Sequence, residues 1–248
     1  MTETQQFRWA LQVAAPQLDM EDAIAWFGSN SDPTIRSFGS DAQPLFLLTS
    51  PQMEVLDAAR EVEDVATRLL AIVNGVLFVL ESDRVPLTSA GVQERAADGK
   101  WINHLGAIGI SNGRSRARAG GMAIVGGMPS PQHTRPAPAS RWSAAAQTDQ
   151  VVWHVLKYLS GKPDWFDFYN AFELMRDDIN RRISRRHRQE QMGWPAKKDL
   201  DHFTLSAQVY RHAPPWDKGY KPANAMPLGE ATRFIHSLTQ IWLTWRFP

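Results

Sequence analysis

The sequence predicts an α+β protein, with an N-terminal mixed, largely antiparallel sheet and one long helix, followed by a C-terminal four-helix unit. Apolar residues recur with period two in short segments of the first half and with period 3.6 in the second. Between them, residues 126–140 are rich in proline and glycine, which is typical of a linker. We therefore expect an α+β domain over residues 1–125, a linker or loop over 126–146, and a helical domain over 147–248.

The first strand is predicted over residues 7–13, where apolar and polar side chains alternate. Asp19 then stands where it would cap a short helix that ends at Gly28. Two further short apolar segments, residues 34–38 and 44–50, are typical of strands in the same sheet.

One long helix is predicted after these strands. Ser50 and Pro51 form its start signal, because serine caps a helix and proline fits the first turn. Apolar residues then recur at spacings of three and four as far as Val73. This helix should pack across the sheet and end at Gly75 or continue to Leu80.

An antiparallel meander is predicted over residues 85–125. Asp98-Gly99 lies between two strand-like segments, and both residues tolerate the positive φ of a tight hairpin turn. The segment from residue 114 onward would add a third strand.

The second half predicts four helices, over residues 148–161, 165–191, 198–211 and 228–246. Each keeps apolar residues at helical spacing, and the connections are short or of medium length.

The composition limits the classes of function. The net charge is +1, so only a local basic patch could bind nucleic acid. Cysteine is absent, which suits a reducing compartment. The N-terminus does not resemble a signal peptide, and the longest apolar segment is too short for a membrane span. We expect a cytoplasmic protein without membrane contact.

Local motifs of the common enzyme classes are missing from the sequence. The seven histidines form no zinc-binding pair, and neither a phosphate-binding glycine loop nor a nucleophile elbow is present. We therefore expect no metal and no cofactor, and the motifs leave open whether the protein is an enzyme.

Two arginine-rich segments could contact phosphates. In one, arginines alternate along a predicted strand, and in the other they share a face near a predicted helix end. The favoured interpretation of the second is a solvated helix end whose cations suit the helix dipole and pair with nearby carboxylates. The candidate binding arginines are Arg114, Arg116, Arg118, Arg181, Arg185 and Arg188.

Arg211 and His212 stand side by side where the third helix of this half ends. Histidine could act as a general acid or base, and arginine could hold an anion through its forked guanidinium. Glu173 is the carboxylate that could complete such a site. The favoured interpretation is structural, with the pair closing the helix and Arg211 meeting Glu173 in an inter-helix ion pair.

Six of the ten tryptophans lie in the helical half. Such residues could stack on bases or line a pocket for a flat ligand, although they more often anchor a core or an interface. Trp194 and Trp216, next to the breaks between helices, are the candidate contact residues.

Residues 164–248 resemble the tail of an uncharacterised bacterial protein family. The matching stretches are DWFDFYNAFELM (164–175), FTLSAQ (203–208), RH (211–212), MPLGEA (226–231) and IWLTW (241–245), with a looser echo at AIVNGVLFVL (71–80). Gln208 stands where the family has asparagine, and Met226-Pro227 inverts the family's order. The resemblance implies a two-part bacterial protein with a helical, distantly HEPN-like C-terminal unit, and it implies no established reaction.

In HEPN-type ribonucleases, four to six residues separate an arginine from the histidine that follows it. His187 follows Arg181 and Arg182 at such spacings. Positions five apart on an unbroken helix diverge by about 140°, so the helix would have to break for the two side chains to converge.

These observations predict a binding or interaction protein of unknown ligand, whose helical half serves as a protein-partner or dimerisation module. The alternatives are a metal-independent HEPN-like ribonuclease and a non-catalytic nucleic-acid-binding protein.

Overall fold

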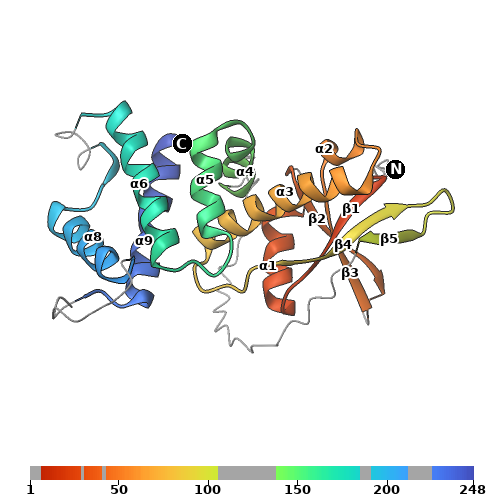
Figure 1. The fold of residues 1–248 in the computed structure, drawn as a ribbon. Coiled ribbons are helices and arrows are strands. Elements are labelled where there is room, and N and C mark those ends of the chain that lie inside the picture. Colours follow the sequence, from red (N-terminus) through yellow and green to blue (C-terminus); the bar gives the residue numbers. More distant parts are fainter. Residues whose placement is uncertain (1–6, 29–30, 41–42, 106–137, 185–190, 212–224) are drawn as a thin grey trace, which may run out of the picture.

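The computed structural model describes residues 7–28, 31–40, 43–105, 138–184, 191–211 and 225–248. A sheet with its own helices forms one end of the molecule and a group of helices forms the other (Figure 1). The long helix α3 (Ala59–Leu80) runs from the first group into the second. The predicted α+β fold is confirmed.

Within the described residues, five strands form one sheet, in the order β2-β3-β1-β4-β5. All neighbouring strands are antiparallel. Their bounds are β1 Trp9–Ala14, β2 Thr34–Ser40, β3 Gln43–Thr49, β4 Thr88–Arg95 and β5 Trp101–Leu105. The hairpin predicted at Asp98-Gly99 is present, and Gly99 has the positive φ of 84° that its turn requires.

The helices of the described residues are α1 Gln17–Phe27, α2 Pro51–Glu54, α3, α4 Pro138–Thr148, α5 Gln150–Leu159, α6 Trp165–Arg182, α8 Lys197–Arg211 and α9 Leu228–Arg246. The bounds predicted for the last helix are confirmed. The helix predicted over 165–191 is shorter than expected, because Ile183 leaves α6 in an extended conformation. The Ile183 side chain is buried, so core packing ends the helix there.

The predicted continuous helix from Ser50 is wrong. Ser50 does cap a helix, but that helix is the single turn α2, and α3 begins only at Ala59. Val55, expected in the buried stripe, is 80% exposed in the break between them.

Polar contacts to β1 account for this break. The Glu54 carboxylate accepts hydrogen bonds from the backbone N–H groups of Arg8 and Trp9, at 2.7 and 3.1 Å. The Leu56 carbonyl accepts a third, from the Trp9 indole at 3.0 Å. In a continuous helix the Leu56 carbonyl would accept a hydrogen bond from the helix itself. The break instead leaves it free to accept one from the Trp9 indole.

Asp19 also differs from its prediction. Pro16 stands at the N-cap of α1, and Asp19 lies in the first turn, almost fully buried. Its carboxylate accepts a hydrogen bond from the Val85 backbone at 3.3 Å and pairs with Arg84 at 3.6 Å. Asp19 therefore fixes the chain after α3 against α1 instead of capping a helix.

The described part of the predicted linker contains helix α4, which begins at Pro138. Ser143 and Gln147 on α4 donate hydrogen bonds to the Asp32 carbonyl, at 3.0 and 2.8 Å. Ser50 donates to the Asp32 carboxylate at 2.6 Å. Residues 138–146 thus belong to a helix docked on the sheet half, and residues 126–137 lie outside the described residues.

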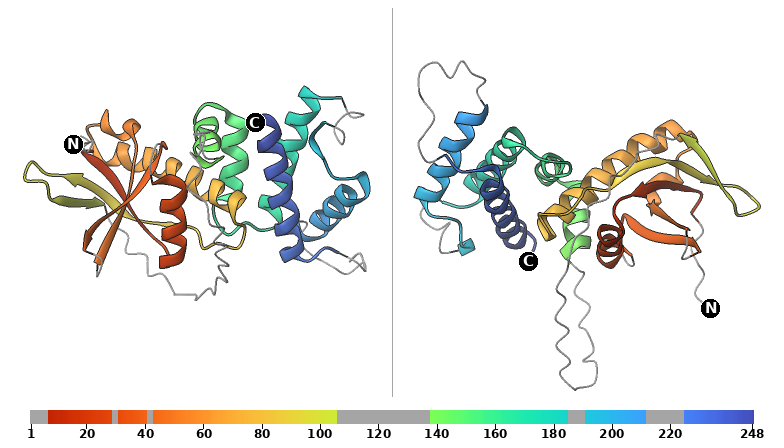
Figure 2. Two further views of the ribbon diagram at one scale, coloured as in Figure 1. Left: turned by 180° about the vertical axis from the view of Figure 1, so that it is seen from behind. Right: turned by 90° about the horizontal axis from the view of Figure 1, so that it is seen from below.

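The second half of α3 is buried on all sides and joins the two groups of elements in one continuous core. Figure 2 shows α3 passing from the sheet to the helices that surround its far end. Within the described residues, no helix is both long and apolar enough to cross a membrane.

Candidate functional site

Glu173 lies on α6 and is half-buried. One of its carboxylate oxygens pairs with Arg176 on the same helix at 2.5 Å, and the other is buried without a hydrogen-bond partner in the described part of the chain. Arg211 ends α8, but its side chain lies outside the described residues. The predicted tie between Glu173 and Arg211 therefore stays a prediction.

Arg181 and Trp194 are described, and they differ in exposure. Arg181 is exposed in the last turn of α6, where its Nε donates to the Asp177 carbonyl at 3.2 Å. Trp194 is 4% exposed and belongs to the core, so its ring has no face left for a ligand. The other candidates lie outside the described residues: Arg114, Arg116, Arg118, Arg185, His187, Arg188, His212 and Trp216.

A small, partly open hollow lies between the end of α3 and the turn after α5. Arg84 lines it with a nearly fully buried side chain, whose Nε lies 3.6 Å from the Asp19 carboxylate and whose Nη1 has no hydrogen-bond partner among the described residues. Burial lowers the pKa of Arg84, although the nearby carboxylates of Asp22, Glu81 and Asp19 oppose this. Because three acidic groups surround one cation, the hollow does not suit an anion.

The sheet offers a more distinctive surface. One face of the sheet packs in the core with α1 and α3. This core face carries Leu11, Ile35, Leu48 and Val92. We call the opposite side the concave face. Antiparallel partners project on the same side, so the register assigns to this face Ala10, Gln12, Arg36, Phe38, Leu45, Leu47, Gln93, Arg95, Trp101 and Asn103.

The concave face brings the two edge strands of the sheet together. Phe38 on β2 and Trp101 on β5 meet edge to face, with ring centroids 6.1 Å apart. A flat five-stranded sheet would hold these strands about 19 Å apart, so both rings reach inward over a curled sheet. Ala10 and Leu47 on this face are fully buried, whereas both rings keep a half-buried position at its rim.

Two arginines of this face lie over aromatic rings. The Arg36 guanidinium is 5.8 Å from the Phe7 ring centroid, and that of Arg95 is 6.0 Å from the Trp101 ring centroid. Such cation–π contacts hold the guanidinium in place while its N–H groups stay available for an anion. Among the paired strand positions of the concave face, no aspartate or glutamate is present.

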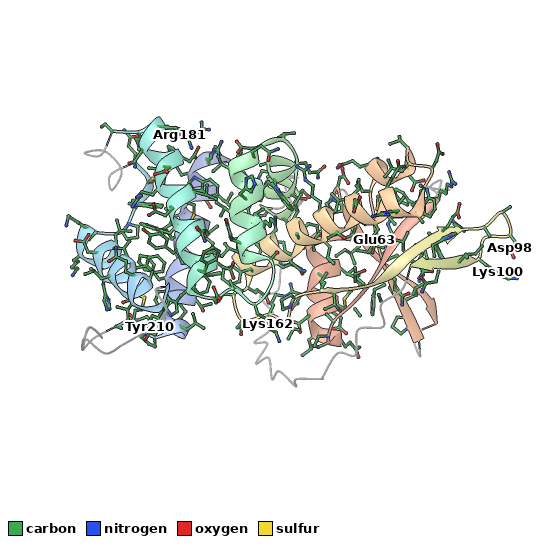
Figure 3. All side chains as sticks on the ribbon, in the orientation of Figure 1. Glu63, Asp98, Lys100, Lys162, Arg181 and Tyr210 are labelled. Atoms are coloured by element: carbon green, nitrogen blue, oxygen red, sulfur yellow. The ribbon has the colours of Figure 1, made fainter. Side chains whose placement is uncertain are left out.

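The acidic residue at the tip of the β4–β5 hairpin, Asp98, has a basic partner of its own. It pairs with Lys100 at 3.0 Å, at the hairpin tip in Figure 3. Hydrogen bonds from the backbone and side chain of Lys100 lower the pKa of Asp98, so it stays ionised and paired. Among the described residues, the ion-pair partner of Asp98 is thus Lys100 and not Arg95.

A second polar cluster lies on the opposite side of β4 and β5. His104 is the extra residue of a β-bulge, because Gln93 pairs with Asn103 and Val92 with Leu105. The bulge directs its Nε2 to the Glu94 carboxylate at 2.7 Å, and Arg8 binds the same carboxylate at 3.0 Å. The hydrogen bond from Arg8 lowers the pKa of Glu94, and His104 adds to this effect. The Glu94 carboxylate on β4 thus links β5, through His104, to the residue that precedes β1, Arg8.

Sequence reasoning missed the concave-face residues, although part of the signal was present. Arg36 and Phe38 are two residues apart in one predicted strand, so they point to the same side of it. Arg95 precedes the predicted hairpin turn by three residues. These positions indicated cations on a sheet. No local pattern indicated that Phe38 and Trp101, on opposite edges, would meet. That contact depends on how far the sheet curls.

The described residues contain no group of three or more histidine, aspartate or glutamate side chains placed to hold a metal ion. Neither the sequence nor the fold matches a protein-family model, a curated protein or a solved structure.

Proposed function

We propose that this chain is a non-catalytic binding protein whose sheet half holds an anionic ligand on the concave face. The observation that carries this proposal is the pair Arg36 and Arg95, each placed over an aromatic ring on a face without acidic residues among its paired positions. Preorganised guanidinium groups bind carboxylate, sulfate or phosphate oxygens by paired hydrogen bonds. The net charge of +1 makes this a local attraction rather than a property of the whole surface.

The proposal is tested with a sulfated polymer that carries charge but no base or peptide. We expect a labelled heparin fragment to bind the wild type at low salt, measured by fluorescence anisotropy. The double substitution Arg36→Gln and Arg95→Gln should weaken binding at least about tenfold, because charge-assisted hydrogen bonds are lost.

The matched control removes two other exposed arginines, through Arg60→Gln and Arg233→Gln, and should change affinity less than about twofold. A third variant, Arg181→Gln, examines the arginine-rich end of α6, which lies far from the hairpin tip (Figure 3). Equal losses in all variants would mean non-specific attraction, and the concave face would then not be the site.

The helical half is proposed as the module that meets a second copy of the chain. Large exposed apolar side chains on its helices support this role, since Phe166, Leu205 and Leu228 are between 44% and 57% exposed. Sedimentation should detect a dimer at micromolar concentration that Leu205→Glu weakens. A strict monomer at all concentrations would remove this part of the proposal.

A further inference from the structure

We infer that the ligand of the concave face is a single-stranded nucleic acid, with bases stacked at Trp101 and Phe38 and phosphates held by Arg36 and Arg95. This inference rests on the proposed function, because it names the anion that the face would hold. The proposed site contains none of the arginines or tryptophans that the sequence indicated as candidates.

Aromatic rings on a β-sheet are the common platform for unpaired bases. Stacking needs a flat π surface and tolerates any base, so a few partly exposed rings are enough. Phe38 and Trp101 are half-buried, and they meet at an interplanar angle of 70°. Their edge-to-face contact fixes both rings, which lowers the entropic cost of stacking a base on either one.

The charges lie where a backbone would pass. Arg95 is beside Trp101 at the β4–β5 hairpin, and Arg36 is two residues from Phe38 on β2. A strand that stacks a base at either ring would therefore have its phosphates near a guanidinium. Arginine suits this task because its planar fork matches two phosphate oxygens.

A single strand fits this face better than a duplex. In a duplex the bases already stack on each other, and their π faces are not accessible to protein rings. Ala10 and Leu47 at the centre of the concave face are fully buried, so a ligand would meet the half-buried rings of Phe38 and Trp101 at its rim. A protein partner would not require the combination of rings with unopposed arginines.

The test compares oligo-dT and oligo-U of about 12 nucleotides with a duplex of equal length, by anisotropy over a salt series. We expect the single strands to bind more tightly than the duplex. Each phosphate contact contributes about 0.7 to the salt slope of a single strand, so Arg36→Gln with Arg95→Gln should reduce the slope by about 1.4.

Substitutions of the aromatic residues test the stacking contribution to affinity, whereas the arginine substitutions test the phosphate contacts. Trp101→Leu should weaken binding roughly 5- to 100-fold with an unchanged salt slope, because a stacking contact carries no charge. Trp101→Phe should retain most of the affinity, and circular dichroism would identify any variant that fails to fold. Denaturing gels after incubation show whether the oligo-U stays intact.

The outcomes separate this inference from the proposed function. Binding of heparin but not of oligonucleotides, both dependent on Arg36 and Arg95, would retain an anion site and overturn the nucleic-acid ligand. Binding of neither would overturn both. Tighter binding of the duplex, or oligonucleotide binding that only Arg181→Gln weakens, would overturn the inference. Cleavage of oligo-U would also overturn it, in favour of a ribonuclease.

Discussion

Gly75 lies where helices α3 and α5 approach each other closely. It lies in the buried half of α3, and a side chain there would meet α5. A Cβ at this position would lie 2.7 Å from the Cβ of Leu156 and closer still to the Leu156 carbonyl oxygen. Glycine weakens a helix, but only glycine lets α3 and α5 approach this closely at position 75.

We expect Gly75→Ala to lower the free energy of unfolding by about 2 kcal/mol, because overpacking against a backbone outweighs the better helix propensity of alanine. Gly229→Ala is the matched control, since nothing lies within 4 Å of a Cβ there. That change should be neutral or stabilise by up to about 1 kcal/mol. Urea denaturation of both variants measures the difference, and equal stabilities would contradict the close contact.

Asp149 caps one helix and also forms an ion pair with another. Its carboxylate accepts hydrogen bonds from the backbone N–H groups of Val151 and Val152 at the start of α5. The same carboxylate pairs with Arg246 near the end of α9. Arg246 is 7% exposed and also pairs with the buried Asp178 at 3.3 Å. The cap of one helix thus fixes the end of another.

Replacing Asp149 by asparagine separates these roles, because asparagine still caps a helix but carries no charge. Asp149→Asn should cost about 1–3 kcal/mol of stability at pH 7, since the nearly buried Arg246 loses a charged partner. Asp164→Asn, at the exposed N-cap of α6, is the control and should change stability by less than about 0.5 kcal/mol.

The cost of Asp149→Asn should also depend on pH. Burial raises the pKa of Asp149, but the hydrogen bond from Val152, the charge and hydrogen bond of Arg246, and the hydrogen bond from Val151 together lower it below its usual value. A lowered folded-state pKa gives stability that is complete above the unfolded value, near 3.9, and is lost as the pH falls through the folded value. Thermal melts of wild type and variant should therefore keep their full difference from pH 7 down to about pH 4 and converge only at lower pH, as Asp149 becomes protonated in the folded protein.

At the scale of the whole molecule, α3 determines how the two halves are related. Its first turns lie along the sheet, and its last turns lie among α4, α5 and α9 (Figure 2). Asn74 adds a polar tie, because its side-chain amide bonds both the N–H and the carbonyl of Leu87, at 2.8 and 2.9 Å. Core packing therefore continues from the strands to the C-terminal helix.

We expect this continuity to make the described structure unfold in one cooperative transition. Circular dichroism at 222 nm reports mainly the helices, and amide hydrogen exchange of β1 and β3 reports the sheet. Both should give the same midpoint in urea, and Gly75→Ala should shift both together. Two separate midpoints would instead support the two independent domains expected from the sequence.

Local signals account for much of the fold. The bounds of α9, the Asp149 cap of α5 and the Asp98-Gly99 turn follow from residues that are neighbours in sequence. The breaks that were missed depend on distant partners. The helix predicted from Ser50 breaks because Glu54 and Leu56 bind β1, and no property of residues 50–60 alone indicates that contact.

The sequence by itself determined the α+β class, the absence of common catalytic motifs and a net charge that excludes a general polyanion binder. Only the tertiary structure decided that Phe38 and Trp101, on opposite edge strands, meet beside two arginines. Periodicity assigns each side chain to a face of its own strand, whereas the curl of the sheet depends on packing across all strands. The concave face is therefore a property of the assembled sheet, and no single segment of the sequence contains it.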